Sequence, residues 1–197
     1  VERVSLAGGF EGRISSRFSY NLKAGYVLYG NEMLETVMMD NSERLSSGIT
    51  YGPYQKWFAG ADLALDVEGF RLDCSVIYTD SWGSVFDMPG VLRPASFTGE
   101  AAVEYNWKRR VFVGADCDFS TARKGSCLKY TVSSYLMPVQ EAVIPGYADL
   151  GLYAEYVTSR RLSFWVRGGN LLNMTIQRNP LYAEKGLNFT AGICLSF

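Results

Sequence analysis

The chain has 197 residues, of which 48% are hydrophobic, 14% are aromatic and none is histidine, and its formal net charge is −1. This near-neutral charge, without a Lys/Arg cluster along one strand face, argues against nucleic-acid binding, and the absence of a run of about 18 apolar residues excludes a transmembrane helix. Because histidine and the common nucleotide-binding and nucleophile motifs are missing, the sequence predicts no enzyme and no cofactor.

Apolar residues alternate with small or polar residues in about nine segments of the chain. In chain order, the predicted strands are residues 2–13, 17–30, 44–67, 70–82, 96–107, 110–121, 147–157, 161–173 and 186–197. Most of them have at least the ~9 to 11 residues with which a tilted strand crosses hydrocarbon. Tight turns are predicted at 15–17, 68–69, 108–110 and 158–160. They alternate with long loops at 31–43, 83–95, 122–146 and 174–185, a rhythm that is typical of an outer-membrane β-barrel.

Within these segments the charged residues share one face of the predicted sheet. In the strand at 70–82, for example, Leu72 and Val76 would face lipid, whereas Arg71 and Asp73 would face inward. We expect a set of inward residues to line the lumen: Lys23, Arg71, Asp73, Glu100, Glu104, Asp116, Asp118, Asp149, Glu155 and Arg167. They would contact either a plug or the permeating solute, and most are expected to serve as a general polar lining.

The last predicted strand has its bulk on one face, ends on an aromatic residue, and carries small or polar residues on its other face. A barrel strand with lipid outside and water inside has this pattern, although a terminal edge strand of a soluble sandwich could show it too. The outward residues form the expected barrel-assembly signal: Phe189, Ile193, Leu195 and Phe197.

The segment 44–67 is long and contains Gly52-Pro53. One strand with a bend at Pro53 keeps the rhythm of short and long connections, whereas two membrane strands would break it. The resulting odd count places the two chain ends on opposite sides of a membrane. Because single-chain bacterial barrels normally have an even number of strands, we expect the C-terminal part of a larger barrel, whose outer strands pair with strands from elsewhere.

All six methionines fall in the predicted external loops, namely Met33, Met38, Met39, Met88, Met137 and Met174. Apolar stretches such as Met33-Leu34 are unusual on a solvated loop, so they could contact a surface lipoprotein, a substrate or another chain. Packing of the long loops on one another is the alternative, and we favour it.

The four cysteines, Cys74, Cys117, Cys127 and Cys194, fall on different strands and faces. Their spacing fits neither a zinc site nor a disulfide framework. Cys117 and Cys127 could meet across a loop, but we expect packed free thiols.

Several motifs near the carboxyl end occur together. They are Pro145-Gly146-Tyr147-Ala148-Asp149-Leu150, then Arg160-Arg161-Leu162, then Asn170-Leu171-Leu172-Asn173, and the run from Gly186 to the terminal Phe197. Together they resemble the last three strands of TonB-dependent outer-membrane receptors, especially those of Bacteroidota. The Asn-Leu-Leu-Asn segment, expected in the next-to-last strand, and the terminal Phe are the more specific parts. The resemblance implies a barrel of ~22 strands with an N-terminal plug, which imports a scarce solute with energy from an inner-membrane complex.

The chain departs from this family pattern because residues 1–197 contain no plug, no energy-coupling box and no signal peptide, so a single barrel segment is expected. We expect it in the bacterial outer membrane, with the lipid bilayer and the rest of its barrel, or another barrel chain, as partners. A surface lipoprotein, and an inner-membrane energy-coupling protein if a plug exists, are further expected partners. Two alternatives stay open: a passive or structural barrel that scaffolds surface partners, and a soluble β-sandwich or lipocalin-like binding protein.

Overall fold

The computed structural model describes residues 3–39, 44–88, 90–130 and 136–195. These residues are mostly strand, and the only helical element among them is the short 3-10 helix η1, Ser84–Asp87. The strands are β1 (Arg3–Ser15), β2 (Phe18–Met39), β3 (Leu45–Val67), β4 (Phe70–Trp82), β5 (Phe97–Trp107), β6 (Val111–Ser120), β7 (Arg123–Tyr130), β8 (Leu136–Ile144), β9 (Tyr147–Ser159), β10 (Leu162–Gly169) and β11 (Asn188–Leu195). Within the described ranges, no helix is long and apolar enough to cross a membrane.

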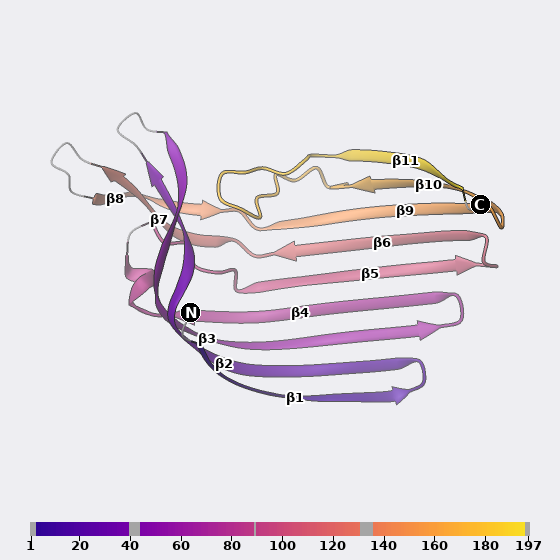
Figure 1. Cartoon of the computed structure of the whole chain (residues 1–197), viewed down its shortest axis with the longest axis horizontal. Coiled ribbons are helices and arrows are strands. Elements are labelled where there is room, and N and C mark those ends of the chain that lie inside the picture. Colours follow the sequence, from indigo (N-terminus) through magenta and orange to yellow (C-terminus); the bar gives the residue numbers. More distant parts are fainter. Residues whose placement is uncertain (1–2, 40–43, 89, 131–135, 196–197) are drawn as a thin grey trace.

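Nine of these strands form a broad antiparallel wall, in the order β1-β2-β3-β4-β5-β6-β9-β10-β11 (Figure 1). The turns β1–β2, β3–β4, β5–β6 and β9–β10 all lie at one end of the wall, which we call the short-turn rim. The longer connections lie at the opposite end. This arrangement confirms the predicted alternation of short and long connections and the predicted antiparallel all-β fold.

Several turn residues at the short-turn rim have positive φ values, and the sequence accommodates them in two ways. Gly69 has a φ of 77°, which glycine adopts without a steric cost. Lys108 and Arg109 have φ values of 53° and 56° although they carry side chains. The side-chain oxygen of Asn106 accepts a hydrogen bond of 2.8 Å from the Arg109 N–H, and this bond helps to hold the strained turn closed.

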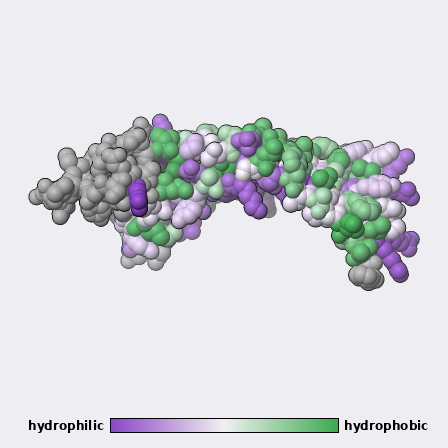
Figure 2. Space-filling model, turned by 90° about the horizontal axis from the view of Figure 1, so that it is seen from above, coloured by the Kyte–Doolittle hydropathy of each residue, from purple (hydrophilic) through white to green (hydrophobic). Residues whose placement is uncertain are grey.

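The two faces of the wall differ in polarity because side chains alternate along each strand. Leu65, Leu72 and Val103 lie opposite one another on one face, which also carries exposed residues such as Leu152 and Ile193. The other face is concave, since it lines a hollow bordered by carboxylates from several strands. Figure 2 shows the molecule as an arched layer on which hydrophobic groups, in green, lie at the surface. The apolar face is therefore the convex one.

Beyond the wall, β2 and β3 continue as a long two-stranded ribbon. Their antiparallel register runs to Met39–Leu45, with one irregularity opposite Pro53. The predicted loop at 31–43 is therefore wrong for residues 31–39, which belong to β2. The single strand predicted at 44–67 is confirmed, and its register break falls at Pro53 because proline has no N–H to donate to the ladder.

A hairpin, β7–β8, occupies most of the segment 122–146, so the prediction of a loop there is wrong. β7 lies parallel to the outer end of β2, through the pair Met38–Leu128. The segment that follows η1 also joins β2, since Leu92 N–H donates to the Glu35 carbonyl oxygen at 3.0 Å. Backbone pairing between distant segments thus creates strands that the local pattern does not indicate.

The β2–β3 ribbon, the β7–β8 hairpin, and η1 with the segment that follows it together form what we call the outer region. Two small hydrophobic clusters form its interior. One contains Leu34, Tyr54, Val85, Phe86 and Val91, and the other contains Val37, Leu92 and Ile144. The apolar residues of the predicted loops are thus used, at least in part, to pack the outer region on itself. This supports the interpretation that the long connections pack on one another.

β10 ends at Gly169, earlier than the predicted end at residue 173. Asn170 and Asn173 have φ values of 47° and 50°, a left-handed conformation that asparagine tolerates better than most residues but that ends a strand. The prediction that Asn-Leu-Leu-Asn lies within the next-to-last strand is therefore wrong, because this segment forms the turn that follows it.

The wall is an open sheet in the described part of the chain. There, the edge strand β1 pairs only with β2, and β11 pairs only with β10. β1 and β11 therefore do not pair with each other among the described residues. That these edges pair with strands from elsewhere stays a prediction.

Candidate functional site

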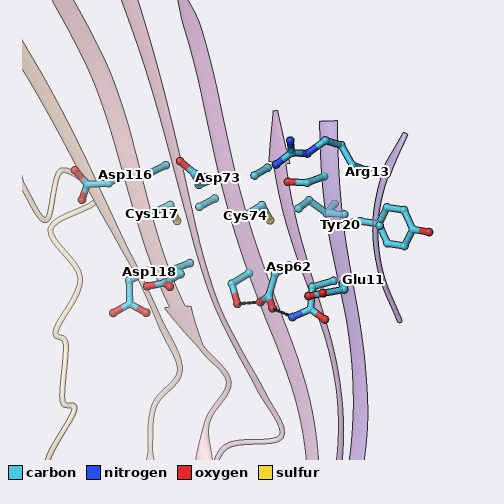
Figure 3. Close-up of a pocket in the computed structure, with 18 residues that line it drawn as sticks. Glu11, Arg13, Tyr20, Asp62, Asp73, Cys74, Asp116, Cys117 and Asp118 are labelled. Atoms are coloured by element: carbon cyan, nitrogen blue, oxygen red, sulfur yellow. Dashed lines mark hydrogen bonds between the residues drawn. The ribbon is translucent and has the colours of Figure 1, made fainter. Parts of the chain in front are cut away.

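A line of polar side chains crosses the concave face from β1 to β9. Its members lie directly opposite one another in the strand register, and we call them the polar row: Glu11, Asn21, Asp62, Ser75, Glu100, Asp118 and Asp149. Most of the row borders a hollow of roughly 770 Å³ (Figure 3). Because neighbouring strands lie only ~4.8 Å apart, the sheet brings carboxylates from five different strands into one line.

Asp62 has the most partners of any carboxylate in the row. It accepts hydrogen bonds from Asn21 Nδ2 at 3.0 Å and from Ser75 Oγ at 2.7 Å, and Lys23 Nζ forms an ion pair with it at 2.8 Å. Figure 3 shows Asp62 between its partners on the adjacent strands. The carboxylate therefore ties β2, β3 and β4 together on the concave side.

Further ion pairs lie closer to the short-turn rim. Arg71 Nε contacts Asp73 Oδ2 at 2.8 Å, and Arg167 Nη2 contacts Asp116 Oδ1 at 3.2 Å. These side chains are largely exposed, so each pair contributes little stability alone. Within the described residues, no three His, Cys, Asp or Glu side chains are placed to hold a metal ion.

Arg178, from the connection between β10 and β11, reaches back to the polar row. We call this connection, residues 170–187, the Arg178 loop. The guanidinium donates to Asp118 Oδ2 at 2.6 Å, to Asp149 Oδ2 at 3.3 Å and to the Glu184 carboxylate. The hydrogen bonds to Asp118 and Glu184 raise the pKa of Arg178 above its ordinary value. A permanent cation therefore holds the loop against β6 and β9.

Arg123 connects the Arg178 loop to the outer region. Its Nη2 donates to the Arg178 carbonyl oxygen at 2.9 Å, and its Nη1 forms an ion pair with the Glu35 carboxylate. These contacts link β7, the outer part of β2 and the loop. Because these charged groups belong to one network, they contribute more to the stability of the fold than the same number of isolated surface ion pairs would.

The buried Asn170 side chain organises the start of the Arg178 loop. Its Nδ2 donates to the carbonyl oxygens of Met174 at 2.8 Å and Lys185 at 3.2 Å, and its Oδ1 accepts from Met174 N–H at 3.0 Å. The backbone N–H of Asn170 donates to Asp149 Oδ1 at 3.1 Å. One side chain thus joins both ends of the loop, and its backbone is bound to the polar row.

The strand register places all ten predicted lumen residues on the concave face. The convex face carries Phe189, Ile193 and Leu195 of the predicted assembly signal, and Phe197 lies outside the described residues. Met33, Met88 and Met174 are exposed. The side chains of the other three loop methionines, Met38, Met39 and Met137, lie outside the described part of the structure.

The cysteines Cys74, Cys117 and Cys194 carry free thiols. A bond between Cys117 and Cys127 is therefore not formed, and the Cys127 side chain lies outside the described part. The expectation of free thiols is thus confirmed at the three described positions, but Cys194 is exposed and is not packed as predicted.

Sequence reasoning missed several members of the site. Asn21 and Asp62 stand at inward positions of predicted strands, so strict alternation could have found them, as it places Ser75 on the inward face. Arg178 and Glu184 lie in a loop without periodicity, and no local signal connects them to Asp118. Their contact depends on how the loop folds back.

Comparisons with known proteins show which solved structures have a similar fold. No protein-family model matches the sequence, and a search of curated proteins finds no match. Among solved structures, the ferric enterobactin receptor of Pseudomonas aeruginosa matches 99% of the chain with a TM-score of 0.72 and 15% identity. The chain has the fold of a TonB-dependent receptor barrel wall. It covers 31% of that receptor, so it corresponds to only part of the larger structure.

Two further receptor structures resemble the wall to a similar degree. The ferripyoverdine receptor of the outer membrane of Pseudomonas aeruginosa matches 98% of the chain, with a TM-score of 0.70, 14% identity and 27% of the receptor covered. The FrpB iron transporter of Neisseria meningitidis matches 97% of the chain, with a TM-score of 0.65, 12% identity and 30% covered. At this level of identity the likeness concerns the fold.

Proposed function

We propose that the chain forms part of the wall of an outer-membrane transporter, which imports a scarce solute with energy from an inner-membrane complex. The observation that carries the proposal is the nine-stranded wall itself, apolar on its convex face and charged on its concave face. The same fold occurs in receptors and transporters for ferric enterobactin, ferripyoverdine and iron. In this protein the remaining barrel strands, and a plug, would come from outside residues 1–197.

The convex face supports a membrane location. Large apolar side chains on this face of the strands, including Leu6, Leu22, Val113, Leu152 and Ile193, are between 40% and 78% exposed. A water-soluble protein rarely exposes a continuous apolar patch of more than a few hundred Å². Hydrocarbon removes this cost, and closure with further strands would satisfy the backbone groups of β1 and β11.

The polar row supports a lumen on the concave side. Glu11 and Glu100 have no ion-pair partner among the described residues, whereas Asp62 and Asp118 are neutralised by Lys23 and Arg178. The line of carboxylates therefore favours a surface with positive charge opposite it. We assign that surface to a plug or to the permeating solute, and we assign the predicted lumen residues to the same lining.

A passive barrel that scaffolds surface partners is the second candidate. Met33 and Tyr51 are register partners in the ribbon beyond the wall, and they are 52% and 60% exposed. An exposed apolar pair outside the membrane is suited to contact with another protein, such as a surface lipoprotein. This candidate needs no energy coupling, whereas import does. The need for energy coupling therefore separates the two functions.

The test begins with location and continues with energy coupling. Cells that produce the full protein are fractionated by density, and the protein should appear with the outer membrane and require detergent for extraction. Uptake of labelled ferric siderophores is then compared with that of cells lacking the gene, before and after the inner-membrane proton gradient is collapsed. A gain in uptake that disappears with the gradient supports import, and a gain that persists supports the passive barrel. Recovery of a detergent-free monomer would contradict both.

A further inference from the structure

A cluster of basic residues at the short-turn rim takes no part in the concave site. Lys108, Arg109 and Arg110 lie in the β5–β6 turn, and Arg160 and Arg161 lie in the β9–β10 turn. All five are exposed, and none has an ion-pair partner among the described residues. The two turns are neighbours, since the Val157 N–H donates to the Arg110 carbonyl oxygen at 2.8 Å. We call these five residues the basic rim.

The charge of the basic rim is not balanced locally. No Asp or Glu occurs in residues 105–113 or 156–164, which contain the two turns and the strand ends beside them. The β3–β4 turn lies on the other side of the β5–β6 turn, since the Asn106 N–H donates to the Gly69 carbonyl oxygen at 2.6 Å. It contains Glu68 and follows Asp66, but neither carboxylate forms an ion pair with the basic rim among the described residues. Five of the 19 Lys and Arg residues of the chain therefore repel one another over two adjacent turns, and an anionic partner would relieve this repulsion.

The apolar neighbours of the basic rim place it at the edge of a membrane. Trp107, Val111, Tyr156 and Phe164 stand in register on the convex face directly beside it. Trp107 is 53% exposed and Tyr156 is 49% exposed, and such aromatic residues gather where hydrocarbon meets lipid headgroups. Lys108 Nζ lies 5.2 Å from the centroid of the Trp107 ring, so this cation accompanies a lipid-facing side chain.

We propose that the basic rim binds the phosphate headgroups of anionic phospholipids in the leaflet beside the short turns. The proposal goes beyond transport and depends only on the membrane placement proposed above. Arginine suits a phosphate because its planar guanidinium donates two parallel hydrogen bonds. On the convex face, Trp107 and its register partners Val111, Tyr156 and Phe164 offer an apolar surface to the acyl chains of the same lipids. A soluble phosphate has no acyl chain and would gain nothing from this surface.

The test measures which lipids the full protein retains. The purified protein is placed in micelles with equal amounts of phosphatidylglycerol and phosphatidylcholine, and retained lipids are counted by native mass spectrometry. The protein should retain phosphatidylglycerol preferentially, and salt should weaken the preference. Replacing Arg160→Gln and Arg161→Gln together should lower the preference by about tenfold or more. Since both side chains are exposed, the barrel should still fold, as its heat-modifiable migration will show.

Matched variants make the result specific. Lys124→Gln with Lys185→Gln removes the same charge from exposed positions at the opposite end of the wall, and it should keep the preference. Lys108→Gln with Arg110→Gln, on the neighbouring turn, should lower it as the first pair does. Dissolved glycerol phosphate should not displace the retained lipid.

Four results would overturn the proposal while leaving transport untouched: equal retention of both lipids, equal losses in the variants from both ends of the wall, full displacement by glycerol phosphate, and binding of an acidic peptide in place of lipid. Failure of the unchanged protein to insert into a membrane would instead contradict the proposed function.

Discussion

Two neighbouring alanines at the centre of β5 offer a direct test of the two faces of the wall. Ala101 points to the convex side, where its register partners are Cys74 and Cys117. Ala102 points to the concave side, between Asp73 and Asp116. The residues have the same size and nearly the same depth, so Ala101→Arg and Ala102→Arg differ only in the environment that receives the new charge.

The expected difference follows from depth and from the neighbouring charges. Ala101 lies six residues from Trp107 at the end of β5, which is ~20 Å along the strand. With a tilt of about 45° this is ~14 Å in depth, close to the middle of an apolar band ~25 Å tall. Arginine there should lower the free energy of unfolding by about 2–4 kcal/mol. Arginine at Ala102 meets two carboxylates and water, so we expect a change of less than about 1 kcal/mol.

Urea unfolding of the full barrel in phospholipid vesicles measures both values, with tryptophan fluorescence as the probe. Leu152→Arg should behave like Ala101→Arg, because Leu152 lies on the same face two strands away. Gly151 is a poor control for that site, since a Cβ there would lie 2.6 Å from Asp116 Oδ2. Equal losses for Ala101→Arg and Ala102→Arg, or a larger loss for the second, would show that the faces are assigned wrongly.

Three further predictions concern separate parts of the molecule. Arg178→Gln should speed amide hydrogen exchange in the Arg178 loop by about tenfold or more without affecting the centre of β9, and unchanged exchange would refute the role of this cation. Cys194, which faces the concave side, should react with a membrane-impermeant maleimide in the folded protein, whereas Cys74 and Cys117 on the convex face should be protected, as peptide mass mapping will show. Burial raises the pKa of Tyr54, in the outer region, to about 12 from 10.0. The neutral phenol therefore stabilises the folded outer region fully below pH 10, and this contribution is lost as the pH rises from 10 to about 12. Tyrosinate absorbance should show this titration, and Tyr54→Phe should remove it.

The wall and its two faces could be predicted from the sequence because both depend on local pattern. Alternation with a period of two assigns a residue such as Asp118 or Leu152 to its face as soon as the strand is recognised. Tight turns are equally local, since Glu68-Gly69 provides a residue that accepts a positive φ. The concave positions of the charged residues followed from these two signals.

The outer region could not be predicted in the same way. The local pattern predicts loops for residues 31–39 and for the segment of the β7–β8 hairpin. These residues form strands because β2, β3, β7 and the segment after η1 pair with one another. Such pairing depends on contacts between distant segments, and these override weak local preferences. The early end of β10 has a local cause, the positive φ of Asn170, but it requires the bonds that Asn170 makes across the loop.

From the amino-acid sequence alone, the protein can be recognised as a series of two-faced strands joined by alternating short and long connections. That information is held in the spacing of apolar residues and in the turn residues, which act over a few positions. The folded arrangement is needed to place Asp62, Glu100 and Asp118 in one row, to bring Arg178 to that row, and to bring five basic residues together on adjacent turns. The strand register and the order of β6 beside β9 control those meetings, because they bring together side chains that are far apart in the chain.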